Sequence, residues 1–274
     1  MSIVGFGVCT WMFGEMALGE VAARVAALGY EGVELLGEVE KYRAAEASHI
    51  LRDRGLAVFS LTPLDVDLAH PDDTIRRQAL DYYYSLLDFA SQLHAPLISC
   101  HGAVGRIRSL VPWEQEWKLM VEGVREVAAR AESLGLRVAM ELLNRYESHL
   151  LNTTEQGLRF IDQVALPNVG LNLDAYHMNI EEPNLEGAVR AAGSHLFLFH
   201  AADSNRQSVG RGHTDFASLI HALNAIAYAG PIILECPAPG PDPFQAVKDD
   251  SSVPWVETYL RESRERLGAM VRRR

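Results

Sequence analysis

The chain has 274 residues, of which 48% are hydrophobic and 22% charged, enough apolar material for a large core and too much for a disordered protein. Its formal net charge of −11 opposes binding to a polyanion, so nucleic acid is not an expected partner. Apolar runs stay short of the ~20 residues that span a bilayer, no secretory signal opens the chain, and the three cysteines form no CxxC pair, so we expect no membrane contact and a reducing cytoplasm.

Eight short apolar runs recur along the chain, separated by longer amphipathic stretches, which is typical of a buried parallel sheet with helices between its strands. The expected strands, in chain order, are Ile3–Cys9, Gly32–Leu36, Ala57–Leu61, Leu97–His101, Arg137–Leu142, Val169–Asp174, Leu196–His200 and Pro231–Glu235. After the fifth, Thr153 with Gln156 three residues later predicts a capping box that starts a helix.

The number of repeats favours a closed barrel over an open doubly wound sheet. No GxGxxG motif follows the first expected strand, and no linker-like segment interrupts the middle of the chain. We therefore predict an α/β protein in which residues 1–274 form a single domain, a (β/α)₈ TIM barrel.

Four potential metal ligands stand at or next to the ends of the last four expected strands: Glu141, Asp174, His200 and Glu235. They are separated by 33, 26 and 35 positions, about one strand-helix unit each. Since parallel strands of a barrel end at one face, these side chains should converge there. Three carboxylates and an imidazole suit Mn²⁺, Mg²⁺ or Co²⁺, and a dication would remove their mutual repulsion.

Further side chains near these strand ends are candidates for binding a substrate: Glu147, His177, Arg206, His101, Trp11 and Trp113. Arg206 could reach a substrate hydroxyl, and a tryptophan could give a sugar ring an apolar face. Each has a structural alternative, because a lone acid is often a surface ion-pair partner and a lone histidine in an apolar strand is often a core residue.

Three strings carry a resemblance to a known family. They are Glu141 to Glu147 (ELLNRYE), Leu173 to Glu182 (LDAYHMNIEE) and His200 to Arg206 (HAADSNR). They resemble the xylose-isomerase-like TIM-barrel superfamily and, within it, the ketose 3-epimerases, the D-tagatose 3-epimerase and D-psicose 3-epimerase family. The specific motifs lie between about Val138 and Pro237, whereas the first half has no string that closely matches that family.

The resemblance implies a ketose whose carbonyl and neighbouring hydroxyl oxygens chelate a divalent metal, Mn²⁺ in the first place. Glu141 and Glu235 would then also act as the acid/base pair, inverting C3 through a cis-enediolate. His177 and Arg206 would hold the substrate near O2 and C1, and Glu147 would contact its hydroxyl end. Relatives are commonly dimers or tetramers, so the resemblance also implies a homo-oligomer.

Four other functions fit the same barrel. An aldose–ketose isomerase of the hydroxypyruvate isomerase type or an inosose dehydratase would use a similar metal site. A metal-dependent nuclease similar to endonuclease IV would need more histidines, several zinc ions and a basic surface, which the acidic balance opposes. A sugar-binding protein without activity would have no need to keep four ligands in register.

Overall fold

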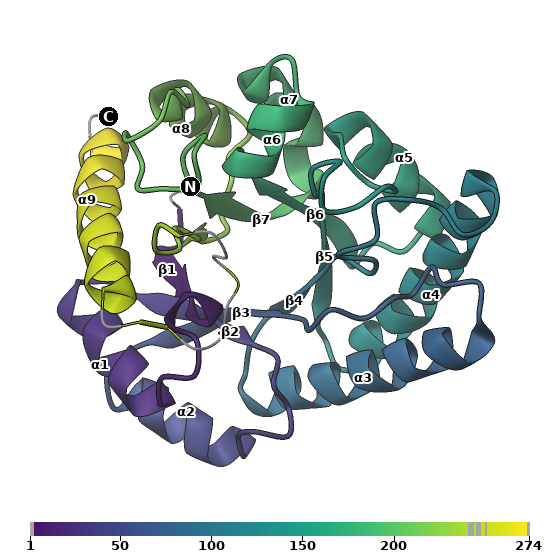
Figure 1. The fold of residues 1–274 in the computed structure, drawn as a ribbon, viewed down its shortest axis with the longest axis horizontal. Coiled ribbons are helices and arrows are strands. Elements are labelled where there is room, and N and C mark those ends of the chain that lie inside the picture. Colours follow the sequence, from purple (N-terminus) through teal and green to yellow (C-terminus); the bar gives the residue numbers. More distant parts are fainter. Residues whose placement is uncertain (1–2, 241–243, 245–247, 250, 273–274) are drawn as a thin grey trace.

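The computed structural model describes residues 3–240, 244, 248–249 and 251–272, and its strands form one eight-stranded parallel barrel (Figure 1). The strands are β1 (Phe6–Cys9), β2 (Gly32–Leu36), β3 (Ala57–Thr62), β4 (Leu97–Cys100), β5 (Arg137–Glu141), β6 (Val169–Asp174), β7 (Leu196–Ala201) and β8 (Ile232–Leu234).

The helices ring the barrel on its outside, as Figure 1 shows. They are η1 (Thr10–Phe13), α1 (Leu18–Ala27), α2 (Ala44–Arg52), α3 (Asp73–Gln92), α4 (Trp113–Ser133), α5 (Thr154–Val164), α6 (Ala175–Glu181), α7 (Leu185–Ala192), η2 (Gly193–His195), α8 (Phe216–Ala225) and α9 (Ser252–Arg272). The prediction of a TIM barrel is confirmed.

The sheet runs in the order β3-β2-β1-β8-β7-β6-β5-β4, and each neighbouring pair is parallel. β3 and β4 lie next to each other and close the ring, although within the described residues no ladder of paired residues joins them. All eight strands therefore end at the same face of the barrel, which is where a TIM barrel carries its chemistry.

The predicted strands agree with the observed ones except at some ends. β1 begins at Phe6 instead of Ile3, and β8 begins at Ile232 because Pro231 has no N–H to donate to a ladder. The predicted capping box is confirmed: the Thr153 hydroxyl accepts the Gln156 N–H at 3.3 Å, and the Gln156 side chain accepts the Thr153 N–H at 3.4 Å.

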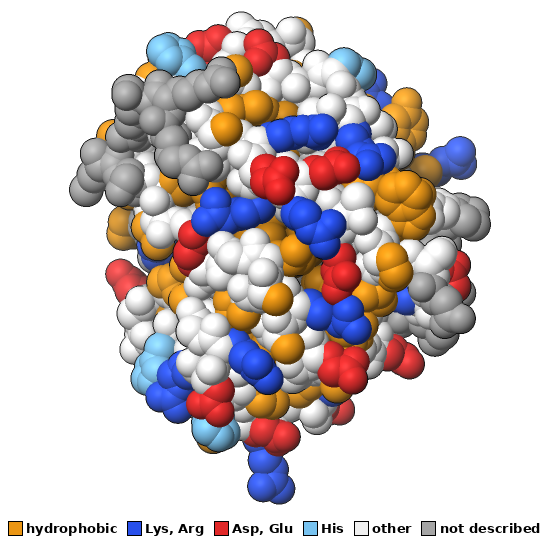
Figure 2. Space-filling model, turned by 90° about the vertical axis from the view of Figure 1, so that its left-hand side faces the viewer, with side chains coloured by type: hydrophobic (Ala, Val, Ile, Leu, Met, Phe, Trp, Pro, Cys, Tyr) orange, Lys and Arg blue, Asp and Glu red, His pale blue; other side chains and the backbone are white. Residues whose placement is uncertain are grey.

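Helix α9 contacts α8 and η1, and its ion pairs connect it to other parts of the chain. Glu257 pairs with Arg24 of α1 at 2.5 Å, and Arg264 pairs with Glu31 at 2.6 Å. Figure 2 views the side of the molecule that carries α9, and acidic and basic side chains alternate across its described surface. That mixture leaves this face without a continuous basic patch.

None of the described helices is both long and apolar enough to cross a membrane.

Candidate active site

A cavity of about 280 Å³ opens where the strands end. Its wall combines side chains from both halves of the chain: Trp11, Leu36, Thr62, Pro63, Leu64, Asp65, His101, Val104, Glu141, Leu143, Glu147, His177, Arg206, Glu235 and Phe244. The volume is close to the lower end for small-molecule sites, and the wall mixes apolar surface with a few converging polar groups, as such sites do.

The four predicted metal ligands converge at this cavity. Glu141 and Asp174 are the last residues of β5 and β6, His200 lies near the end of β7, and Glu235 follows β8 directly. One ligand atom from each lies within 4.8 Å of the others, and all four side chains are buried. The parallel ladder sets this arrangement, since Asp174 is in register with His200 across the β6–β7 pair.

The electrostatics of the cluster call for a cation. Asp174 accepts the Tyr176 N–H through Oδ1 at 2.8 Å, whereas its buried Oδ2 has no hydrogen-bond partner among the described residues. Burial and the neighbouring Glu235 carboxylate raise the pKa of Asp174 to about 8. A dication would satisfy the orphaned oxygen and allow all three acids to ionise together, so the donor set fits a divalent metal.

In the metal-free protein, the imidazole of His200 carries the positive charge that offsets the carboxylates of the cluster. Its Nδ1 lies 3.3 Å from Oε1 of Glu141 and 3.8 Å from Oε2 of Glu235. Burial alone would raise the pKa of Glu141, but the hydrogen bond and charge of His200 outweigh burial and lower it to about 2. Glu141 is therefore a carboxylate at neutral pH.

The four ligands differ in what they face. Glu141 and Glu235 line the cavity, whereas Asp174 and His200 are not among its lining residues in the described chain. A molecule in the cavity can thus touch both glutamates. Asp174 and His200 stand behind them, where they could contact a metal ion without contacting a substrate.

Arg206 contacts two acids of the site, Glu235 and Glu147. Its Nη2 donates to Oε2 of Glu235 at 3.0 Å, and its Nη1 lies 3.4 Å from Oε1 of Glu147. The guanidinium carbon also lies 4.7 Å from the Tyr176 ring centroid and 5.8 Å from that of Trp11. Although burial works against the charge, the surrounding carboxylates raise the Arg206 pKa further, so this cation is permanent.

His177 is held as a neutral donor. Its Nδ1 accepts the backbone N–H of Asn144 at 3.2 Å, which places the ring proton on Nε2. Burial, with the nearby Arg206 charge, lowers the pKa of His177 to about 3. The side-chain amide of Asn144 donates to Oε1 of Glu147 at 2.9 Å, so one residue positions both His177 and Glu147.

Of the other predicted substrate contacts, His101 and Trp11 lie at the cavity and Trp113 does not. His101 lines the cavity, and its buried Nδ1 has no partner among the described residues, while burial lowers its pKa. Trp11 also lines the cavity, and its Nε1 donates to Oε1 of Glu235 at 2.7 Å.

The structure does not bring Trp113 to the cavity, contrary to the sequence-based expectation. Trp113 begins α4, stacks on Trp117 with ring centroids 4.9 Å apart, and donates its indole N–H to the His149 carbonyl at 3.2 Å. The 3.6-residue period of α4 turns this ring toward the next turn of its own helix instead of toward the barrel axis.

Two residues near the site escaped the sequence analysis. Asn144 lies inside the ELLNRYE string but has no charge to mark it. Glu34 is fully buried in β2, in hydrogen-bond contact with His200. The signal for Glu34 was available, because a carboxylate inside a strand buried on both faces is rare unless something pairs with it.

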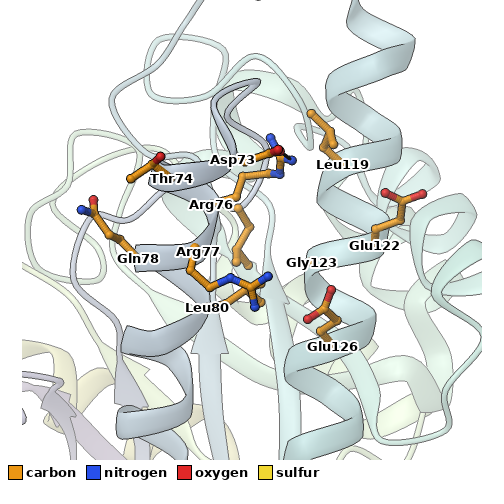
Figure 3. A pocket seen from close by; sticks show the side chains of 11 residues that line it. Asp73, Thr74, Arg76, Arg77, Gln78, Leu80, Leu119, Glu122, Gly123 and Glu126 are labelled. Carbon is orange, nitrogen blue, oxygen red and sulfur yellow. Dashed lines mark hydrogen bonds and ion pairs between the residues drawn. The ribbon is translucent and has the colours of Figure 1, made fainter.

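A second cavity, of about 590 Å³, lies away from this site. Figure 3 shows that side chains of α3 and α4 line it, among them Arg77, Glu122 and Glu126. These three side chains are exposed, and none belongs to the metal-ligand cluster. The larger cavity is therefore a groove between two outer helices.

Known proteins are similar to this chain in sequence and fold. The chain is 38% identical over 177 residues to the D-psicose 3-epimerase of Ruminiclostridium cellulolyticum, covering 62% of this chain and 59% of that protein. It is 30% identical over 231 residues to the D-psicose 3-epimerase of Agrobacterium fabrum, covering 79% and 78%. A crystal structure of D-psicose 3-epimerase with D-tagatose from Clostridium cellulolyticum superposes with a TM-score of 0.88 at 26% identity, over 97% of this chain and 99% of that one.

The first alignment spans about three fifths of the relative's length, whereas the structural match spans nearly all of it. The profile of the family described as xylose isomerase-like TIM barrel matches residues 22–259, which include all four residues of the cluster. The chain belongs to the xylose isomerase-like TIM barrel family.

Proposed function

We propose that this protein is a metal-dependent ketose 3-epimerase, an isomerase that inverts C3 of a free ketose. The observation that carries the proposal is that Glu141 and Glu235, alone among the four cluster residues in the described chain, face the cavity. Two carboxylates that reach the substrate from one cluster supply both the base and the acid that an epimerisation needs. Both relatives given above carry the name D-psicose 3-epimerase, which supports the proposal.

The reaction needs one proton removed from C3 and one returned to it. One glutamate takes the C3 proton, the C2 carbonyl and O3 become the oxygens of a cis-enediolate, and the other glutamate delivers a proton to the opposite face of C3. A bound dication supplies stabilisation of the negative charge that develops on the enediolate oxygens. No atom is gained or lost, and only the configuration of C3 changes.

The neighbouring side chains position the sugar. His177 offers its Nε2 proton to the region of O2 and C1, because Asn144 occupies the other ring nitrogen. Arg206 binds a substrate oxygen there, and its Nη2 holds Oε2 of Glu235 at 3.0 Å. Glu147 binds a hydroxyl at the far end, and His101 and Trp11 complete the wall.

We assign the binding of the metal to Glu141, Asp174, His200 and Glu235 and propose Mn²⁺ as the ion, with Mg²⁺ or Co²⁺ as substitutes, because the set is oxygen-rich with one nitrogen. A cytoplasmic location is supported by three cysteines that are free and buried. The expectation of a homodimer or homotetramer stays a prediction, which sedimentation velocity tests.

The test is proton exchange at C3. Metal-stripped protein and Mn²⁺-loaded protein are incubated in D₂O with a panel of ketohexoses and ketopentoses, and NMR follows each carbon after the metal is removed. We expect deuterium at C3 together with the C3 epimer, and only in the loaded sample. Exchange confined to C1, with an aldose as product, would instead identify an aldose–ketose isomerase. Loss of water would identify a dehydratase, and no exchange in the panel would reject the proposal.

A further inference from the structure

Glu34 lies next to the metal-ligand cluster, in contact with His200, and is not part of the cavity wall. It is fully buried in β2 and accepts hydrogen bonds from the hydroxyls of Ser60 and Thr62. The thiol of Cys9 lies 3.8 Å from its Oε1. Nε2 of His200 lies 3.2 Å from Oε1 and 3.3 Å from Oε2. Side chains of three strands, β1, β3 and β7, thus converge on one carboxylate of β2.

Such a group is expensive to bury. A carboxylate without a cation loses several kcal/mol of hydration on burial, about what two good hydrogen bonds return. Among the described residues no Lys or Arg comes within 4.0 Å of Glu34, and the basic group that it faces is Nε2 of His200, at 3.2 Å. Packing alone would be served better by an apolar residue, so the contact with His200 is the feature that needs this acid.

The two nitrogens of His200 point to different groups. Nε2 is directed to Glu34, whereas Nδ1 is directed to Glu141 and Glu235 in the cluster. The amide nitrogen of Asn172 lies 3.4 Å from Nδ1 and 3.3 Å from Nε2, so it favours neither nitrogen. The two nitrogens differ in what their carboxylates belong to: Nδ1 faces two of the proposed metal ligands, whereas Nε2 faces Glu34, which is outside the cluster and remains available to accept a proton.

We propose that Glu34 is a positioning residue for the metal site, which accepts the Nε2 proton of His200 and so fixes the tautomer that presents the Nδ1 lone pair to the metal. This inference rests on the proposed function only for the presence of the metal. Carboxylates that hold a ligating histidine in this way typically contribute 10–100-fold to metal affinity or activity. Glu34 does not line the cavity, and it acts through His200.

The first experiment measures Mn²⁺ binding to metal-stripped protein by titration calorimetry. We expect Glu34→Gln to weaken Mn²⁺ binding by about 10–100-fold. Turnover of the best ketose should fall at limiting Mn²⁺ and recover at high Mn²⁺, with the sugar KM unchanged at saturation. Affinity within about twofold of wild type in a folded Glu34→Gln protein would overturn the inference.

Glu116→Gln is the matched control. Glu116 is an equally buried carboxylate that pairs with Arg106 at 2.5 Å and contacts His149, in a network that does not touch the cluster. Its substitution should lower the midpoint of thermal unfolding while leaving the Mn²⁺ dissociation constant within about twofold. An equal loss of affinity in Glu116→Gln would show that both variants act through general destabilisation and would overturn the inference.

A second measurement needs no variant of Glu34 to fold. Wild-type protein labelled with ¹⁵N-histidine and loaded with diamagnetic Mg²⁺ reports each tautomer in long-range ¹H–¹⁵N spectra, with His200 assigned by its loss in His200→Gln. We expect a proton on Nε2, whereas a proton on Nδ1 would contradict the inference. If wild type binds Mn²⁺ but exchanges no ketose proton, the proposed function fails and the Glu34 result is read from the binding data alone.

Discussion

The two halves of the barrel contribute different chemistry to one cavity. Strands β5 to β8 end in the four buried groups of the metal cluster. Strands β1 to β4 supply a mainly apolar wall, including Trp11 and Leu36, and the buried Glu34, which is not part of that wall. The second half thus provides the reacting groups, while the first half shapes the space around them and orients one of the ligands.

The largest loss of activity is expected when either of the two glutamates that transfer the proton, both in the second half of the barrel, is replaced. Glu141→Gln and Glu235→Gln each keep a ligating oxygen but remove a base, so kcat at saturating metal should fall by about 10²–10⁴. Steady-state epimerisation of the best ketose measures it. Glu186→Gln on the exposed face of α7, where Glu186 pairs with Arg190 at 2.7 Å, serves as the control and should stay within about twofold. Full turnover by either site variant would show that the acid/base assignment is wrong.

The half from β5 to β8 could be predicted from the sequence because its potential metal ligands recur at regular intervals along the chain. One acid or histidine per strand-helix unit needs nothing but the parallel topology to bring the four side chains together, and they do converge. The first half could not be predicted in the same way. Glu34 is one letter in an apolar strand, and its partner His200 is 166 positions away. The ring of Trp113 stacks on Trp117, four residues on, and this contact can be expected only once residue 113 is known to begin a helix.

A stability prediction concerns the loop that carries Arg206. Asp203 is buried and accepts the backbone N–H groups of Ser204 and Gly210, both at 2.7 Å, and of Thr214 at 3.0 Å. Burial alone would raise the Asp203 pKa, but these amides lower it. Asp203→Asn turns an acceptor-only group into one that also donates, which should cost about 1–3 kcal/mol of unfolding free energy at pH 7. Urea unfolding measures it.

The pH dependence of that loss has a definite sign. Since the folded-state pKa of Asp203 lies below the unfolded value of about 3.9, its contribution is complete above that value and is lost as the pH falls through the folded pKa. The difference between wild type and Asp203→Asn should therefore narrow in acid. Asp215→Asn, at the N-cap of α8, exchanges two equally good caps and should change little. A difference for Asp203→Asn that stays constant down to acid pH would show that its charge is not what holds the loop.

Trp11, in the first half of the barrel, should affect catalysis through its hydrogen bond to Glu235 in the second half. Trp11→Phe keeps an aromatic wall but removes the N–H that donates to Oε1 of Glu235 at 2.7 Å. One hydrogen bond to a carboxylate among several should lower kcat/KM by roughly 3–10-fold. Initial rates at low ketose concentration measure it. An unchanged kcat/KM would mean that Arg206 alone is sufficient to orient Glu235.

The smallest effect on kcat/KM is expected for Trp113→Phe, because Trp113 belongs to the first half of the barrel but does not line the cavity. Trp113 makes the same kind of contact as Trp11, one indole N–H donated to one oxygen, but its acceptor is the His149 carbonyl and its ring stacks on Trp117 outside the cavity. Kinetics should stay within about twofold, while the unfolding free energy falls by about 1 kcal/mol with the lost hydrogen bond and stacking. The two substitutions remove the same atoms, so their effects on kcat/KM can be compared directly. An equal loss of kcat/KM in both variants would contradict the placement of Trp113 outside the site and would support the sequence-based expectation that it contacts the sugar.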